Sequence, residues 1–100
     1  MSNVDRIFRE YKITKTEQEK IMNVMDKYRE DIANGIRVSN GAFEADIIAI
    51  FGGNMQAARH VPAIEYHFCE YVAKGFMEEG RWVEVFSTLY GEFPKYKGMI

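Results

Sequence analysis

The chain has 100 residues, which fits one domain with a single core, because about 65% of the surface can be buried at this size. An apolar share of 47% and a charged share of 28% are typical of globular proteins and exclude a disordered chain. The net charge of −2 gives no general attraction to nucleic acid or anionic lipid, and no apolar run could span a bilayer. A single cysteine excludes an internal disulfide, so we expect a cytoplasmic protein that does not contact a membrane.

Two amphipathic helices are predicted in the first third of the chain. Residues 2–11 carry four apolar side chains at helical spacing: Val4, Ile7, Phe8 and Tyr11. The second helix is predicted to begin within two residues of two overlapping capping boxes, Thr14 with Glu17 and Thr16 with Glu19. Its apolar stripe consists of Ile21, Val24, Met25, Tyr28 and Ile32. Gly35 can end this helix in a left-handed turn.

Three further segments are predicted to be helical. Residues 42–53 contain only two charges and are expected to lie near the centre of the fold. A long helix is predicted from Pro62 to Gly80, with a second apolar strip that is covered on both sides or forms an oligomer contact. Its expected inward residues are Val61, Ile64, Phe68, Tyr71, Val72 and Gly75.

The segment 81–93 completes the prediction. It has Trp82, Val85, Phe86 and Leu89 at helical spacing, although its aromatic and β-branched content leaves a strand open. We therefore predict an all-α fold, a bundle of four to five helices in one domain of residues 1–93. Residues 94–100, which begin at Pro94, are expected to form a C-terminal tail.

The stretch 52–71 concentrates residues that could carry chemistry. Residues 44–61 fit a helix-turn-helix DNA-binding regulator loosely, with Gln56, Arg59 and His60 facing outward as anion or nucleic-acid contacts. The charge argues against DNA, because residues 40–80 hold two basic and six acidic groups, a net −4. Nucleic acid therefore stays an alternative. A second alternative is a small molecule or anion bound at a helix or oligomer junction near Arg59 or His60.

Metal and enzyme chemistry is not expected. On one helix His60 and His67 would be about 10.5 Å apart along the axis, too far to share one ion. Cys69 lies about 200° around the helix from His67, so the two cannot form a catalytic pair. The sequence also lacks a phosphate-binding loop, a nucleophile elbow and an HExxH motif. We predict no cofactor, no metal and no enzymatic activity.

The aromatic content of the last fifth favours protein contact. Five aromatic residues are concentrated there: Trp82, Phe86, Tyr90, Phe93 and Tyr96. Aromatic side chains are core material first, but they are also preferred anchors at interfaces. The working hypothesis is a non-enzymatic protein-interaction domain with a regulatory, accessory or inhibitory role. Its acidic and aromatic surface would suit a protein partner with basic patches, or a second copy in a homodimer or other homo-oligomer.

Overall fold

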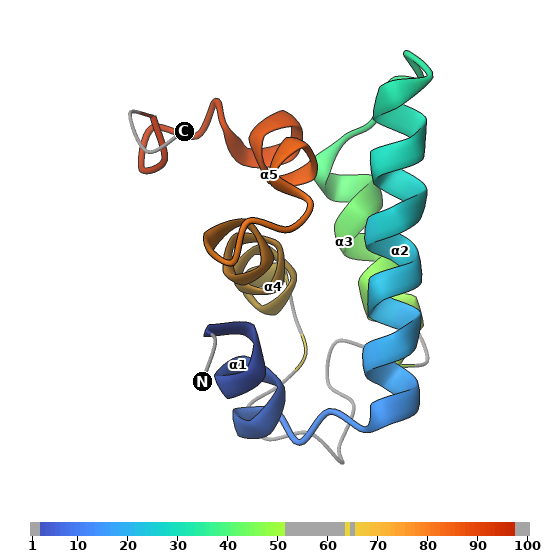
Figure 1. Cartoon of the computed structure of the whole chain (residues 1–100), viewed down its shortest axis with the longest axis vertical. Coiled ribbons are helices and arrows are strands. Elements are labelled where there is room, and N and C mark those ends of the chain that lie inside the picture. Colours follow the sequence, from blue (N-terminus) through green and yellow to red (C-terminus); the bar gives the residue numbers. More distant parts are fainter. Residues whose placement is uncertain (1–2, 52–63, 65, 98–100) are drawn as a thin grey trace.

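The computed structural model describes residues 3–51, 64 and 66–97, and the described chain is helical without any strand (Figure 1). Its helices are α1 (Asn3–Glu10), α2 (Lys15–Ala33), α3 (Asn40–Ala49), α4 (Tyr66–Glu78) and α5 (Val83–Tyr90). The prediction of an all-α bundle is confirmed. The last segment is helical, which decides against the strand that its composition left open.

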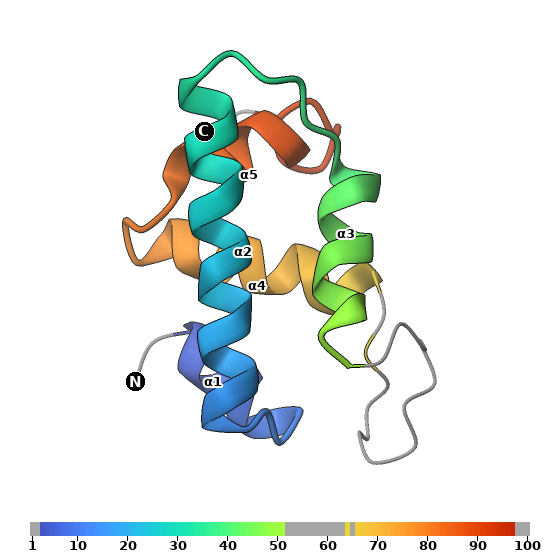
Figure 2. The same ribbon diagram turned by 90° about the vertical axis from the view of Figure 1, so that its right-hand side faces the viewer.

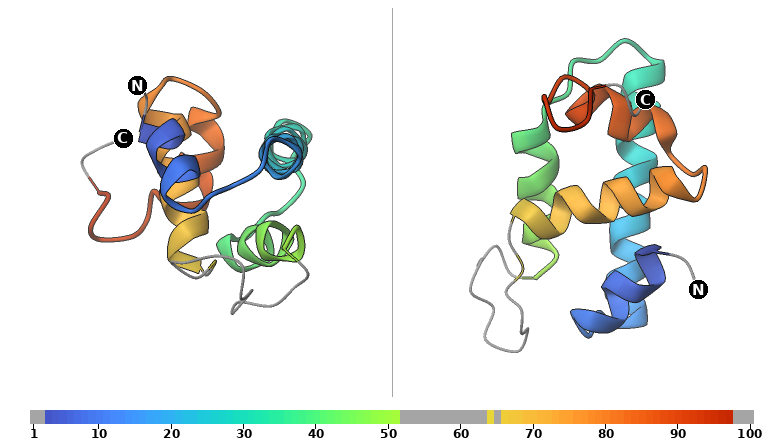
Figure 3. Two further views of the ribbon diagram at one scale, coloured as in Figure 1. Left: turned by 90° about the horizontal axis from the view of Figure 1, so that it is seen from below. Right: turned by 90° about the vertical axis from the view of Figure 1, so that its left-hand side faces the viewer.

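Helix α4 is the centre of the fold. It contacts α1, α3 and α5, while α2 contacts α3 and α5. Figure 2 and the right-hand view of Figure 3 show α4 crossing α2, with α1 and α5 on opposite sides of it. Seven residues of α4 are buried: Phe68, Cys69, Glu70, Val72, Ala73, Gly75 and Phe76. The helices around α4 cover its main apolar strip. The second strip, predicted at Tyr66 and Met77, is only partly covered, because Tyr66 is 49% exposed while Met77 packs against the edge of the core.

The expectation that residues 42–53 lie at the centre is wrong for the described part of that segment. Only Phe43 and Ile47 of α3 are buried, whereas its alanines face solvent. Alanine raises the apolar count of a segment but loses little by staying exposed, so a low charge count overstated the burial of α3.

Close packing fixes the direction of α1 against α4. A Cβ atom added at Gly75 would lie 3.3 Å from the Cβ of Val4, so glycine allows the two backbones to approach. Further along, the rings of Tyr11 and Phe68 meet edge to face at 4.8 Å between centroids. Residue numbers therefore rise along α1 as they fall along α4, and the two helices are antiparallel.

Local motifs set the helix ends. Thr14 and Glu17 form the first of the two predicted capping boxes, with backbone-to-side-chain bonds of 3.0 and 3.1 Å, whereas Thr16 lies inside α2. Three helices end in a left-handed residue: Lys12 after α1, Gly35 after α2 and Gly80 after α4. In each case the next residue donates its N–H to a carbonyl five positions back, as in a Schellman motif. The Gly80 turn reverses the chain and brings Arg81 and Trp82 toward α2.

Two tyrosines lie in surroundings that differ from those predicted. Tyr71 was expected to face inward but is 45% exposed, because it lies about 100° around α4 from Val72, beyond the edge of the buried arc. Tyr96 is only 5% exposed and belongs to the core, so residues 94–97 pack on the domain where a tail was expected. Pro62 and Val61 lie outside the described residues.

Candidate functional site

The five aromatic residues predicted to bind protein fall into a buried group and a partly buried group in the structure. Phe86 and Tyr90 are fully buried and Tyr96 nearly so, which makes these three side chains part of the core. Trp82 and Phe93 are partly buried and pack against the edge of the core. The expected aromatic surface is therefore much smaller than the sequence suggested, and Trp82 and Phe93 are the two members that a partner could touch.

Carboxylates explain why tyrosines are buried. The Tyr90 hydroxyl donates to Glu44 at 2.7 Å, and the Tyr96 hydroxyl donates to the buried Glu70. Tyr28 donates in the same way to Asp46 at 2.7 Å. A buried phenol with a hydrogen-bond partner avoids the cost of an unsatisfied polar group. Three of the six acids in residues 40–80 thus serve the core, which reduces the acidic surface inferred from the net charge of that segment.

Because of these contacts, the stability of the folded state is expected to depend on pH in the alkaline range. Burial, and then the neighbouring carboxylate, raises the pKa of Tyr28, Tyr90 and Tyr96 above the ordinary value of 10.0. The folded state therefore holds these protons more tightly than the unfolded chain. The resulting stability is fully present below pH 10.0, the pKa of an unperturbed tyrosine, and is lost as pH rises through the higher folded-state pKa values.

We expect the free energy of unfolding to fall when pH is raised from about 10 to about 12, above the pKa of an unperturbed tyrosine. Urea titrations followed by circular dichroism at each pH measure this slope. Tyr28→Phe should make the slope shallower, because phenylalanine has no proton to lose. Tyr66→Phe, which changes an exposed ring, is the control and should leave the slope unchanged. A stability that is constant over this range would contradict the expectation.

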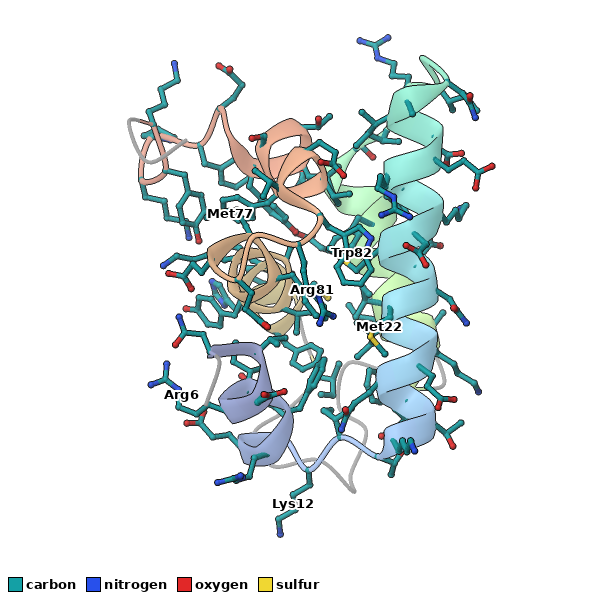
Figure 4. The ribbon with its side chains drawn as sticks, viewed as in Figure 1. Arg6, Lys12, Met22, Met77, Arg81 and Trp82 are labelled. Carbon is teal, nitrogen blue, oxygen red and sulfur yellow. The ribbon has the colours of Figure 1, made fainter. Side chains whose placement is uncertain are left out.

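Several side-chain contacts meet at the surface around Trp82. We call Met22, Arg81, Trp82 and Val83 the Trp82 corner, and Figure 4 labels the first three of these residues. Trp82 has a φ of 49°, a left-handed conformation that is strained for a bulky residue. Its indole N–H donates to Asp26 of α2 at 3.0 Å. The left-handed backbone thus coincides with a side chain held in one orientation.

Arg81 completes this arrangement. Its guanidinium lies over the rings of Phe76 and Trp82, at 4.8 and 4.9 Å from their centroids. Nη2 of the same group is 3.6 Å from the sulfur of Met22, on α2. Sequence patterns did not single out Arg81 or Met22, which are 59 positions apart. The one sequence feature that pointed to this arrangement was Gly80, whose left-handed turn directs the two following residues toward α2.

The rim of the corner is acidic and solvent-exposed. Val83 is 38% exposed, and Glu79 and Glu84 on either side of the Arg81–Trp82 pair face solvent. Asp26 is already engaged by Trp82 and by Arg29, whose Nη2 is 3.0 Å from Oδ1. The corner therefore combines apolar and aromatic side chains and the Arg81 guanidinium with exposed carboxylates at its edge.

The residues considered for metal binding or catalysis have other surroundings. Cys69 is fully buried and its thiol donates to the Glu44 carbonyl at 3.7 Å, while burial raises the pKa of this thiol and disfavours the reactive thiolate. His67 is half-buried, between the rings of Tyr66 and Tyr71. Within the described ranges no three His, Cys, Asp or Glu side chains form a possible metal site. Gln56, Arg59 and His60 lie outside those ranges, as does the second half of the predicted DNA-binding motif.

Comparison with protein-family models, curated proteins and solved structures found no match to this chain. None of the helices in the described part of the chain has the length and apolar character needed to cross a membrane.

Proposed function

We propose that this chain is a protein-binding domain with a regulatory, accessory or inhibitory role, and that it presents the Trp82 corner to its partner. The observation that carries the proposal is the strained, left-handed Trp82, held at the surface by Asp26 and Arg81. A tryptophan that adopts this conformation costs the fold stability, and such strain is concentrated at functional positions.

The composition of the corner supports binding to protein. Tryptophan, arginine and methionine are enriched at interfaces, and a few such residues provide most of the binding energy. The side chains are already fixed, so a partner would not have to order them on binding. Glu79 and Glu84 at the rim favour a partner with basic groups beside an apolar anchor. A reducing compartment such as the cytoplasm suits the single thiol of the chain.

The proposal is tested by changing the surface of the corner without touching its packing. Val83→Asp places a charge at an apolar position of the corner, and Glu79→Lys with Glu84→Lys reverses the rim. Glu19→Lys, an exposed change on α2, is the matched control. We expect proteins retained by the unaltered chain in affinity capture to be lost with both corner variants and kept with the control. The same set of captured proteins with every variant would reject the corner as the binding site.

Self-association is measured in the same series. Sedimentation velocity of the unaltered chain and of Val83→Asp shows whether the partner is a second copy. A dimer that dissociates in Val83→Asp but persists in Glu19→Lys identifies the corner as a homodimer contact. A dimer that persists in all variants would place self-association elsewhere on the molecule.

A further inference from the structure

A groove with different chemistry lies between α1 and α4. Its volume is about 390 Å³, within the range of roughly 300–1,000 Å³ that is usual for ligand sites. The residues that matter for its chemistry are Arg6, Glu10, Tyr11, Tyr71, Lys74 and Glu78. None of them belongs to the Trp82 corner, so binding in the groove does not depend on the function proposed for that corner.

The charges of the groove follow a fixed order. At one end the amide of Asn3 donates to Glu78 at 2.8 Å. Because α1 and α4 are antiparallel, Arg6 of α1 and Lys74 of α4 come next along the two walls. Glu10 follows one helical turn, about 6 Å, beyond Arg6. The groove therefore has two positive charges in its middle and a carboxylate toward each end.

The two central cations form no ion pair with the described residues, and each has a carboxylate one turn along its own helix, Glu10 or Glu78. Arg6 projects outward from α1 (Figure 4). The Lys74 ammonium lies 5.8 Å from the centroid of the Tyr96 ring, a contact that provides no hydrogen-bond acceptor for it. Both cations line the same cavity, so an anion bound in it could be contacted by either of them.

Aromatic rings lie beside these cations. The Tyr71 ring is 45% exposed and stacks on His67, with 6.1 Å between centroids and 19° between planes. The centroid of the His67 ring lies 4.2 Å from that of the exposed Tyr66, so the row of rings continues along α4. Tyr11 is fixed edge to face against Phe68 on the other wall. An apolar side chain next to a bound anion would thus find an aromatic surface.

We propose that the α1–α4 groove binds a protein segment in which an acidic side chain is flanked by apolar residues and then by basic residues. The carboxylate lies between Arg6 and Lys74 and accepts charge-assisted hydrogen bonds from both. A neighbouring apolar side chain packs on Tyr71. The outer basic residues of the segment face Glu10 and Glu78, which match it in charge and fix its register.

Short peptides test this directly. The probes are fluorescein-labelled, end-blocked peptides of the pattern Lys-X-Glu-X-Lys, with X as Leu, Phe or Tyr, and each is matched by a peptide with Gln in place of Glu. Fluorescence anisotropy at low salt measures affinity for the full chain. We expect at least one Glu peptide to bind about tenfold more tightly than its Gln counterpart, because a charge-assisted contact is lost in the latter.

Protein variants locate the binding. Arg6→Gln with Lys74→Gln should reduce the affinity for the Glu peptide to that for the Gln peptide. Lys12→Gln with Lys20→Gln changes the net charge equally at exposed positions outside the groove and should keep full affinity. Thermal melting by circular dichroism verifies that both double variants are folded.

Several results would overturn the proposal. These are equal affinity for the Glu and Gln peptides, no binding by any probe, or undiminished binding to the Arg6→Gln, Lys74→Gln variant. Displacement of the Glu peptide by a single-stranded oligothymidylate at lower concentration than by unlabelled peptide would instead assign the groove to nucleic acid. A concentration-dependent dimer that disappears in the same double variant would assign it to a second copy of the chain.

Discussion

Replacement of Phe68 by alanine is expected to lower the free energy of unfolding by about 3–5 kcal/mol. Phe68 is fully buried in α4, and its ring centroid lies 4.8 Å from that of Tyr11, just after α1, and 6.0 Å from that of Phe51, just after α3. The substitution removes the side chain through which three segments touch and leaves a cavity among rigid rings. Domains of this size have only about 5–15 kcal/mol of stability, so the loss is a large part of the total.

Urea unfolding followed by circular dichroism measures the effect of Phe68→Ala. Tyr66→Ala, two positions earlier on the same helix, removes a ring that is 49% exposed and should change stability by less than about 1 kcal/mol. If the two variants were equally stable, Phe68 would not be the point where α1, α4 and the end of α3 meet.

The sequence predicted the helix ends that are set by residues close together in the chain. The start of α2 was predictable because Thr14 and Glu17 satisfy each other's backbone groups within one turn. Its end was predictable because Gly35 adopts a left-handed conformation at little cost. Lys12 shows the limit of this reasoning, since it takes the same left-handed position without being glycine, while the next residue, Ile13, is buried.

Burial of the tyrosines could not be predicted in this way. Tyr90 and its acceptor Glu44 are 46 positions apart, and Tyr96 and Glu70 are 26 apart. Hydrophobic periodicity shows which face of a helix is apolar, but it does not show whether a phenol on that face will meet a carboxylate. Without that information the rings near the C-terminus looked like surplus aromatic surface, and the acids of residues 40–80 looked like a charged face.

The candidate site was predicted only in part for the same reason. Trp82 could be chosen from composition, but the Asp26 and Met22 contacts that fix the corner come from a helix more than 50 positions earlier. The α1–α4 groove was not predicted at all. Arg6 and Lys74 are ordinary surface cations in the sequence, and they share a groove because Gly75 lets α1 lie close to α4.

The C-terminal segment should stabilise the domain rather than trail from it. Glu70 is buried in α4, and its carboxylate is held by the Tyr96 hydroxyl and by the Lys95 ammonium at 2.7 Å. The Tyr96 ring also packs edge to face on Phe86, with 5.0 Å between centroids. A buried carboxylate that loses its partners is far more costly than one that was never paired.

We therefore expect Tyr96→Ala to lower the free energy of unfolding by about 3–5 kcal/mol, since a core ring and a hydrogen bond to a charged group are both lost. Tyr96→Phe separates the two contributions and should cost about 1.5–3 kcal/mol, the usual value of a hydrogen bond to a charge. Both are measured by urea unfolding, with Lys97→Ala at an exposed position as the control.

Truncation after residue 93 should destabilise the domain at least as much as Tyr96→Ala, whereas removal of residues 98–100 keeps Tyr96 in the chain. If the truncated chain were as stable as the full one, the expectation that residues 94–100 form a tail would be correct. It would also require Glu70 to be solvated by water once its partners are gone, because an isolated carboxylate in the core cannot remain ionised without cost.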